Sequence, residues 1–70
     1  MPKRTFSERV GKNLNEILYD KKISQTELAK AVDVSNMTIS KLVNGTRVPS
    51  AEKLTAIEAY LGVSHERLTR

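Results

Sequence analysis

The sequence predicts an all-α fold, a compact five-helix domain, on three observations. Apolar residues recur every three or four positions, and no stretch shows the sustained alternation of a strand. A serine or threonine stands at the start of each expected helix, twice with a glutamate three positions later, as in a capping box. Gly45 and Gly62 directly follow apolar stripes, where glycine commonly ends a helix.

Length and composition limit the class of protein. The 70 residues make one domain, which we expect to span residues 1–70 with residues 1–4 as a flexible basic arm. A chain this short buries only about 60% of its unfolded surface. The lack of cysteine excludes disulfides and thiolate metal sites, and no apolar run approaches the roughly 18 residues of a membrane span. We therefore expect a soluble, cytoplasmic protein.

The first helix is expected over about residues 6–22, after a Thr5 N-cap. Its apolar stripe consists of Phe6, Val10, Leu14, Ile17 and Leu18. Gly11 inside this helix costs up to about 1 kcal/mol relative to alanine, and we attribute it to the close approach of another helix. Phe6, Tyr19 and Tyr60 are expected in the core or at its edge, and Ile23 is expected to be a buried hinge residue.

The centre of the chain predicts two short helices joined by a tight turn. The first covers Gln25 to Val32, the turn is Asp33-Val34, and Ser35 caps a second helix that Asn44-Gly45 closes. At about 100° per residue, one face of the second helix collects the core residues Ile39, Leu42 and Val43. The opposite arc collects Met37, Ser40, Lys41 and Asn44, with Asn36 at the exposed first turn. Surface helices usually carry Glu/Lys pairs outward, so this polar face is unusual.

The last third of the chain predicts two more helices. Ser50 caps the fourth helix, whose core stripe is Leu54, Ile57 and Leu61 and which ends at Gly62. Ser64 caps a short fifth helix around Leu68. His65 is expected to be exposed in its first turn, and with no second histidine and no cysteine it does not indicate a metal site.

The net charge of +4 is unevenly distributed. Residues 1–47 hold nine Lys or Arg against five acids, whereas residues 48–70 hold three of each. The positive excess therefore lies with the two-helix unit, which favours a polyanionic partner. Small soluble domains often carry such a charge for solubility alone, and Lys30 and Lys41 are open to that interpretation.

The chain resembles the phage repressor/Cro helix-turn-helix family, also called the xenobiotic-response-element family, in Gln25-x-x-Leu28-Ala29, Val34-Ser35, Ile39-Ser40 and Asn44-Gly45. The resemblance covers roughly residues 5–69 and implies a lambda-repressor-like domain in which helices 2 and 3 form the helix-turn-helix. The turn position that is usually glycine in this family is Asp33 here. Because Asp tolerates φ > 0 better than most residues, we expect the turn to survive with some strain.

The resemblance implies a sequence-specific double-stranded DNA-binding transcriptional regulator, a CI/Cro-like repressor of bacterial or phage origin. It would bind a two-fold symmetric operator as a homodimer through helix 3 in the major groove, with no cofactor, metal or small-molecule substrate. Base readout is expected from Asn36, Met37, Ser40 and Lys41. Contacts with the DNA backbone are expected from Gln25, Ser35, Asn44, Thr46, Arg47, Lys3 and Arg4. The dimer surface would involve the fifth helix and the loop before it, with Val63 and Leu68 as candidate contacts.

Other interpretations remain open from the sequence. A protein-interaction or antitoxin-like module with the same fold predicts an apolar outward patch on helix 3 or 4, yet Met37 is alone among polar neighbours. Met37 itself fits a core position, and Lys3-Arg4 fits a disordered tail. An enzyme has no support, because the sequence shows no paired carboxylates, metal-ligand spacing or phosphate-binding glycine loop.

Overall fold

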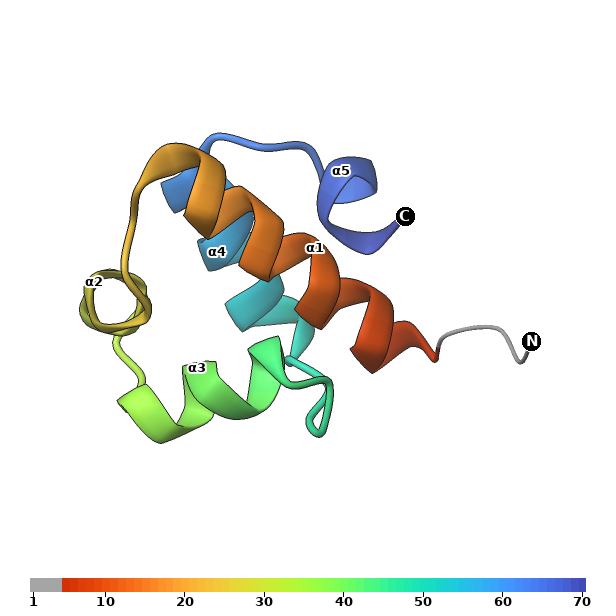
Figure 1. Ribbon diagram of the computed structural model, residues 1–70, viewed down its shortest axis with the longest axis horizontal. Coiled ribbons are helices and arrows are strands. Elements are labelled where there is room, and N and C mark those ends of the chain that lie inside the picture. The colour runs from red at the N-terminus through yellow and green to blue at the C-terminus, as the bar shows by residue number, and fades with distance from the viewer. Residues whose placement is uncertain (1–4) are drawn as a thin grey trace.

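The fold of residues 5–70, the part of the chain that this computed structural model describes, consists of helices in a compact arrangement (Figure 1). The helices are α1 (Phe6–Lys21), α2 (Gln25–Ala31), α3 (Asn36–Val43), α4 (Ala51–Leu61) and α5 (His65–Thr69). The all-α, five-helix prediction is confirmed, although α1 and α2 each end one residue earlier than expected. The predicted basic arm, with Lys3 and Arg4, lies outside the described residues. No helix within 5–70 is long and apolar enough to cross a membrane.

Every helix begins at its predicted N-cap. The side-chain oxygens of the five caps accept hydrogen bonds of 3.0–3.2 Å from the backbone N–H three positions later. The caps are Thr5, Ser24, Ser35, Ser50 and Ser64. The carboxylates of Glu8 and Glu27 accept hydrogen bonds from the backbone N–H groups of the caps three positions earlier, which completes two capping boxes. Since a cap contributes about 1 kcal/mol, the helix starts are fixed by local sequence.

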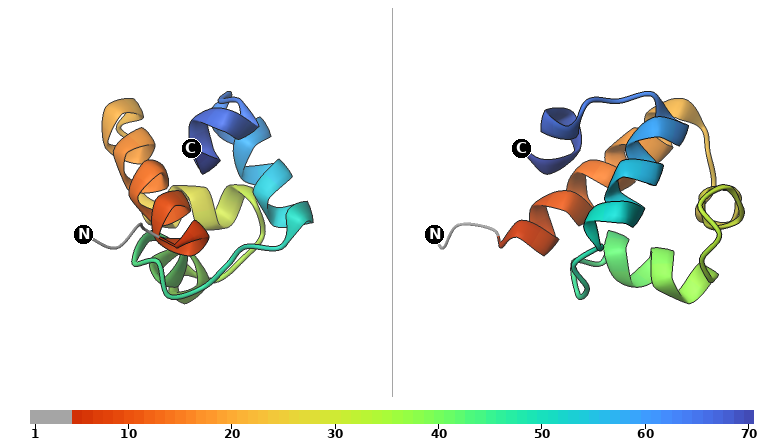
Figure 2. Two further views of the ribbon diagram at one scale, coloured as in Figure 1. Left: turned by 90° about the vertical axis from the view of Figure 1, so that its right-hand side faces the viewer. Right: turned by 180° about the vertical axis from the view of Figure 1, so that it is seen from behind.

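The buried side chains of the described residues are all apolar. The hydrophobic core cluster draws on all five helices and on the α2–α3 turn: Val10, Leu14, Ile17, Leu18, Leu28, Ala29, Val32, Ile39, Leu42, Leu54, Ile57, Leu61 and Leu68. α1 packs against α3 and α5, whereas α2 packs against α3 and α4. Figure 2 shows α3 and the loop after it along one edge of the molecule, so one side of α3 is left uncovered.

Gly11 lies where α1 meets the C-terminal end of α3. A Cβ atom added at this position would be 2.5 Å from the carbonyl oxygen of Leu42 and 2.7 Å from that of Val43. Real Cβ atoms do not approach backbone oxygens so closely, so only glycine allows the two helices to pack at this distance. The expectation that Gly11 marks the close approach of another helix is confirmed.

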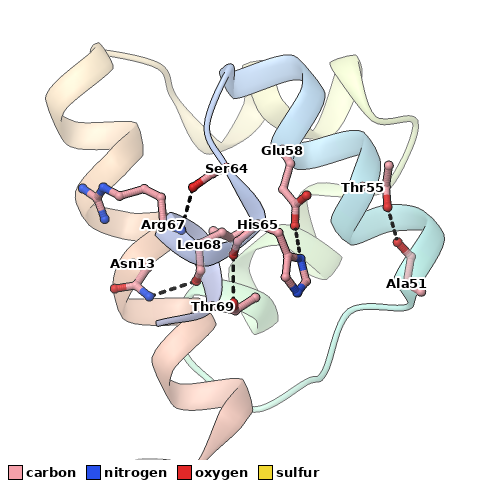
Figure 3. A network of polar contacts seen from close by, with 9 residues as sticks. All are labelled: Asn13, Ala51, Thr55, Glu58, Ser64, His65, Arg67, Leu68 and Thr69. Atoms are coloured by element: carbon pink, nitrogen blue, oxygen red, sulfur yellow. Dashed lines mark hydrogen bonds and ion pairs between the residues drawn. The ribbon is translucent and has the colours of Figure 1, made fainter.

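Residues of α1 hold the C-terminal end of α5. Asn13 Nδ2 donates hydrogen bonds to the carbonyl oxygens of Leu68 at 2.9 Å and Arg70 at 3.0 Å, and Figure 3 shows Asn13 facing Leu68. The Leu68 side chain is fully buried. The prediction of Leu68 as a dimer contact is therefore wrong, because this side chain fills the core of its own subunit.

α4 and α5 are also joined by a polar contact outside the core. His65 Nδ1 lies 2.7 Å from Glu58 Oε2, and Figure 3 shows the two side chains facing each other. His65 is exposed, as predicted, but the sequence did not indicate its partner seven positions earlier. No cluster of three or more His, Cys, Asp or Glu residues able to hold a metal ion is present within 5–70.

The aromatic side chains lie further out than expected. Tyr19 is 84% exposed, so its placement in the core or at its edge is wrong. Nine positions separate it from Val10, which at about 100° per residue places it on the opposite side of α1. Phe6 and Tyr60 are also exposed, at 38% and 45%, and are not among the residues packed against the core. Ile23 is half-buried rather than buried.

Two non-glycine residues adopt left-handed backbone conformations. Lys22, at the C-cap of α1, and Asp33, in the α2–α3 turn, both have φ of 58°, which confirms the positive φ expected at Asp33. We predict that Lys22→Gly raises the free energy of unfolding by about 0.5–1 kcal/mol, because glycine removes the steric cost of a Cβ atom at positive φ. The gain is reduced because glycine loses more chain entropy on folding. Asp33→Gly should stabilise less, since Asp tolerates this region better.

Thermal unfolding followed by circular dichroism measures both changes. A matched control is Gly62→Ala at the C-cap of α4, where φ is 68° and an added Cβ would meet nothing within 4 Å. This variant isolates the backbone cost and should unfold at a lower temperature than the parent. A melting temperature lowered by Lys22→Gly or Asp33→Gly would contradict the left-handed assignment at that residue.

Candidate nucleic-acid interface

The turn between α2 and α3 fixes the direction in which α3 leaves the core. The backbone N–H of Val34 donates to the carbonyl oxygen of Ala29 at 2.9 Å, and Asp33 between them supplies the left-handed step. Val34 is half-buried against the core, and Ser35 then caps α3. The turn is thus held at both ends, by a backbone bond and by an apolar contact.

Lys53 of α4 provides a third restraint on this turn. Its Nζ donates to the carbonyl oxygen of Val32, the C-cap of α2, at 3.0 Å. The cation thereby satisfies a carbonyl that has no partner within the helix and sits at the negative end of the helix dipole. Sequence reasoning missed Lys53, because no local pattern links residues 21 positions apart.

α3 presents two different faces. Ile39 and Leu42 are buried at 0% and 2% exposure, whereas Met37 is 67% exposed. Asn36 and Lys41 are also exposed, and Ser40 is half-buried. The predicted orientation of α3 is confirmed, and the interpretation of Met37 as a core residue is wrong. The role of each outward side chain stays a prediction.

The outward side chains have unused hydrogen-bonding groups. Within residues 5–70, the side chains of Asn36, Lys41, Asn44 and Arg47 form no hydrogen bond or ion pair. α3 contains no acidic residue, and Lys41 is its one charged residue. The exposed face therefore offers amide and cationic groups without an internal partner, which suits a ligand with many acceptors and negative charge.

The remaining predicted backbone contacts differ in how available they are. Gln25 is exposed at the first residue of α2, where N–H groups favour an anion. Ser35 uses its hydroxyl to cap α3. Both donors of Thr46 point to the carbonyl oxygen of Lys41, the backbone N–H at 3.0 Å and the hydroxyl at 3.2 Å. A phosphate contact from Thr46 requires one of these bonds to be exchanged.

A short helix, a tight turn and a second helix with an exposed polar face define a helix-turn-helix unit of the DNA-binding kind. The chain belongs to the HTH_3 helix-turn-helix family, whose model matches residues 14–68. The resemblance to Cro/CI-type regulators is thereby confirmed. The protein is a helix-turn-helix DNA-binding transcriptional regulator.

Solved structures of gene regulators have the same fold. The clp gene regulator ClgR from Corynebacterium glutamicum is 31% identical, with a TM-score of 0.91 over 96% of this chain and 71% of that chain. The SOS-response transcriptional repressor LexA from Eubacterium rectale is 26% identical, with a TM-score of 0.88 over 100% of this chain and 74% of that chain. The restriction-modification controller protein C.AhdI from Aeromonas hydrophila, at 21% identity and a TM-score of 0.82 over 89% of this chain and 94% of that chain, shares the fold. No curated protein sequence matched significantly.

Proposed function

We propose that this regulator is a repressor that binds a two-fold symmetric operator as a homodimer, with α3 in the major groove of each half-site. The observation that carries the proposal is the division of α3 into a buried apolar face and an exposed face of polar groups without internal partners. The major groove of B-DNA admits one α-helix and presents a distinct donor and acceptor pattern for each base pair. A similar structure that is named a transcriptional repressor supports the repressor role.

The outward residues of α3 would divide the work of sequence readout. The Asn36 amide suits bidentate bonding to adenine, and the exposed Met37 side chain can pack against a thymine methyl group. Lys41 reaches guanine or a phosphate. Ser40, which is half-buried, contacts a base or the backbone only at short range.

A second group of residues would set the position of α3 on the duplex without reading sequence. Gln25 and Arg47 flank α3 from the start of α2 and from the loop after α3, and both are exposed. Asn44, Ser35 and Thr46 belong to the same group, as do Lys3 and Arg4, which lie outside the described residues. Each cation that neutralises a phosphate increases the salt dependence of binding.

The homodimer contact is proposed around Val63, in the loop between α4 and α5. Val63 is half-buried in the single subunit, so part of its surface is available to a second copy. Recognition of half-sites about 34 Å apart requires two copies on one face of the duplex.

The alternative, a module that binds a protein partner, predicts a large apolar patch on α3 or α4. Met37 is the one large apolar side chain on the exposed face of α3. On α4, Tyr60 is the one large apolar residue more than one-third exposed. Neither helix therefore presents a contiguous apolar surface among the described residues, and DNA is the better-supported partner.

Repeated selection of bound duplexes from a random pool tests the proposal. We expect enrichment of an inverted repeat whose half-site centres lie about 10 base pairs, or a multiple of this, apart. Affinity for the selected site should fall linearly on a log–log plot against salt, with a slope of about −0.9 for each neutralised phosphate. No retardation of any duplex at low salt would favour the protein-interaction module, and binding without enrichment would exclude sequence-specific recognition.

A further inference from the structure

A cleft opens between α3, the loop after it and α4, on the inner side of α3. Its volume is about 380 Å³, within the range of small-molecule sites. Its floor is lined by core side chains that are only 0–5% exposed, namely Val32, Ile39, Leu42 and Ile57. The accessible apolar surface therefore lies at the entrance, where half-buried Val34 and Val48, which is 58% exposed, line the cleft.

The charged groups of this cleft are of one sign. Arg47 and Lys53 line it, and none of the described residues that line it is acidic. Lys53 uses one donor on the carbonyl oxygen of Val32, which leaves two of its three N–H groups for a ligand. Arg47 makes no bond to any residue within 5–70 and is exposed. An apolar entrance and two cations match a ligand with an apolar body and one anionic end.

We propose that the α3–α4 cleft binds a small amphipathic carboxylate, whose chain packs against Val34 and Val48 at the entrance and whose anionic end pairs with Arg47 and Lys53. Arg47 is also one of the proposed phosphate contacts. A carboxylate that holds Arg47 withdraws it from the DNA backbone, so the ligand and DNA bind with negative coupling. The existence of the carboxylate site does not depend on the proposed function. The negative coupling between the ligand and DNA does rest on the proposed function.

Titration of the DNA-free protein with octanoate, followed by NMR of methyl and amide groups, tests the site. We expect saturable shifts confined to the cleft, including Val34 and Val48. Octan-1-ol and octylammonium have the same chain without the anionic charge and should bind at least about tenfold more weakly, the size expected for charge-assisted pairing. Hexanoate, which has two methylenes fewer, should bind up to about 15-fold more weakly, the effect expected when both methylenes are fully buried.

Val48→Asp places an anionic group at the entrance of the cleft on an exposed loop residue. It should weaken octanoate binding at least about tenfold through like-charge repulsion. Asn15→Asp adds the same charge on the exposed side of α1, outside the cleft, and should leave octanoate binding unchanged. The site is overturned if octanol binds as tightly as octanoate, if Val48→Asp has no effect, or if shifts are absent or scattered over the basic surface.

The coupling is measured separately, by gel retardation of the selected duplex with and without octanoate. Saturating octanoate should lower the DNA affinity about fivefold or more, a common size for coupling between two sites. Octanoate binding without this loss would overturn the coupling and leave the site in place. Failure of the protein to bind any duplex would contradict the proposed function, and the NMR titration would still decide whether the carboxylate site exists.

Discussion

Gly11→Ala should destabilise the domain by about 2 kcal/mol, even though alanine favours helix by about 1 kcal/mol. The added methyl group would lie 2.5 Å from the Leu42 oxygen and 2.7 Å from the Val43 oxygen. Both are backbone atoms at the end of α3, so neither can rotate away as a side chain would. In a domain of this size the melting temperature should fall by about 10 °C.

Asn15→Ala is the matched control for this variant. It places alanine in the same helix at an exposed position, so it adds the same helix propensity without the collision. We expect Asn15→Ala to unfold at or slightly above the temperature of the parent. A Gly11→Ala protein as stable as the parent would show that α1 and α3 are further apart than the structure places them.

The double substitution Asn36→Ala with Lys41→Ala should lower affinity for the selected operator about 100-fold, because a good side chain–base contact contributes about 1–3 kcal/mol. Both residues are exposed and without internal partners in the described chain, so the free energy of unfolding should change by less than about 0.5 kcal/mol. Gel retardation with the selected site and with an unrelated duplex measures the specific and the non-specific DNA affinity.

The single variants separate the two kinds of contact. Asn36→Ala should relax sequence preference at one position of each half-site, whereas a phosphate role for Lys41 predicts a uniform loss and a salt slope smaller by about 1. Lys30→Ala, which removes an exposed cation from α2, serves as the charge control and should retain operator preference. If the double variant bound the operator as the parent does, α3 would not be the reading helix.

The helix starts were predictable because their cause is local. A cap and the glutamate three positions later are sufficient to define an N-terminus, and Thr5 with Glu8 or Ser24 with Glu27 can be identified without any tertiary contact. The orientation of α3 was also predictable, since Ile39 and Leu42 recur at the helical period and must face a core.

Residues whose placement depends on contacts distant in sequence were not predictable in this way. Asn13 holds the carbonyl oxygen of Leu68, 55 positions later, and no pattern on α1 indicates this contact. The full burial of Leu68 follows from that packing, which is why its assignment to a dimer surface failed. The hydrogen bond from Lys53 to the carbonyl oxygen of Val32 is a further contact of this kind.

Tyr19 is a different kind of error. The helical period places it opposite Val10, so its exposure could have been calculated. The error came from treating an aromatic side chain as a core residue by type rather than by position. The left-handed conformation of Lys22 was missed for the opposite reason, because lysine is not a residue type that indicates a positive φ.

Because α3 has a buried apolar face and an outer face whose side chains form no hydrogen bonds, the two faces of the helix can evolve separately. Ile39 and Leu42 contribute to folding, while the side chains of Asn36, Met37 and Lys41 form no hydrogen bond with the rest of the described chain. Under the proposed readout by α3, new operator preferences would arise by exchanging a few outer side chains, with little selection pressure from stability. Duplicated copies of such a gene could diverge in their targets while keeping one scaffold.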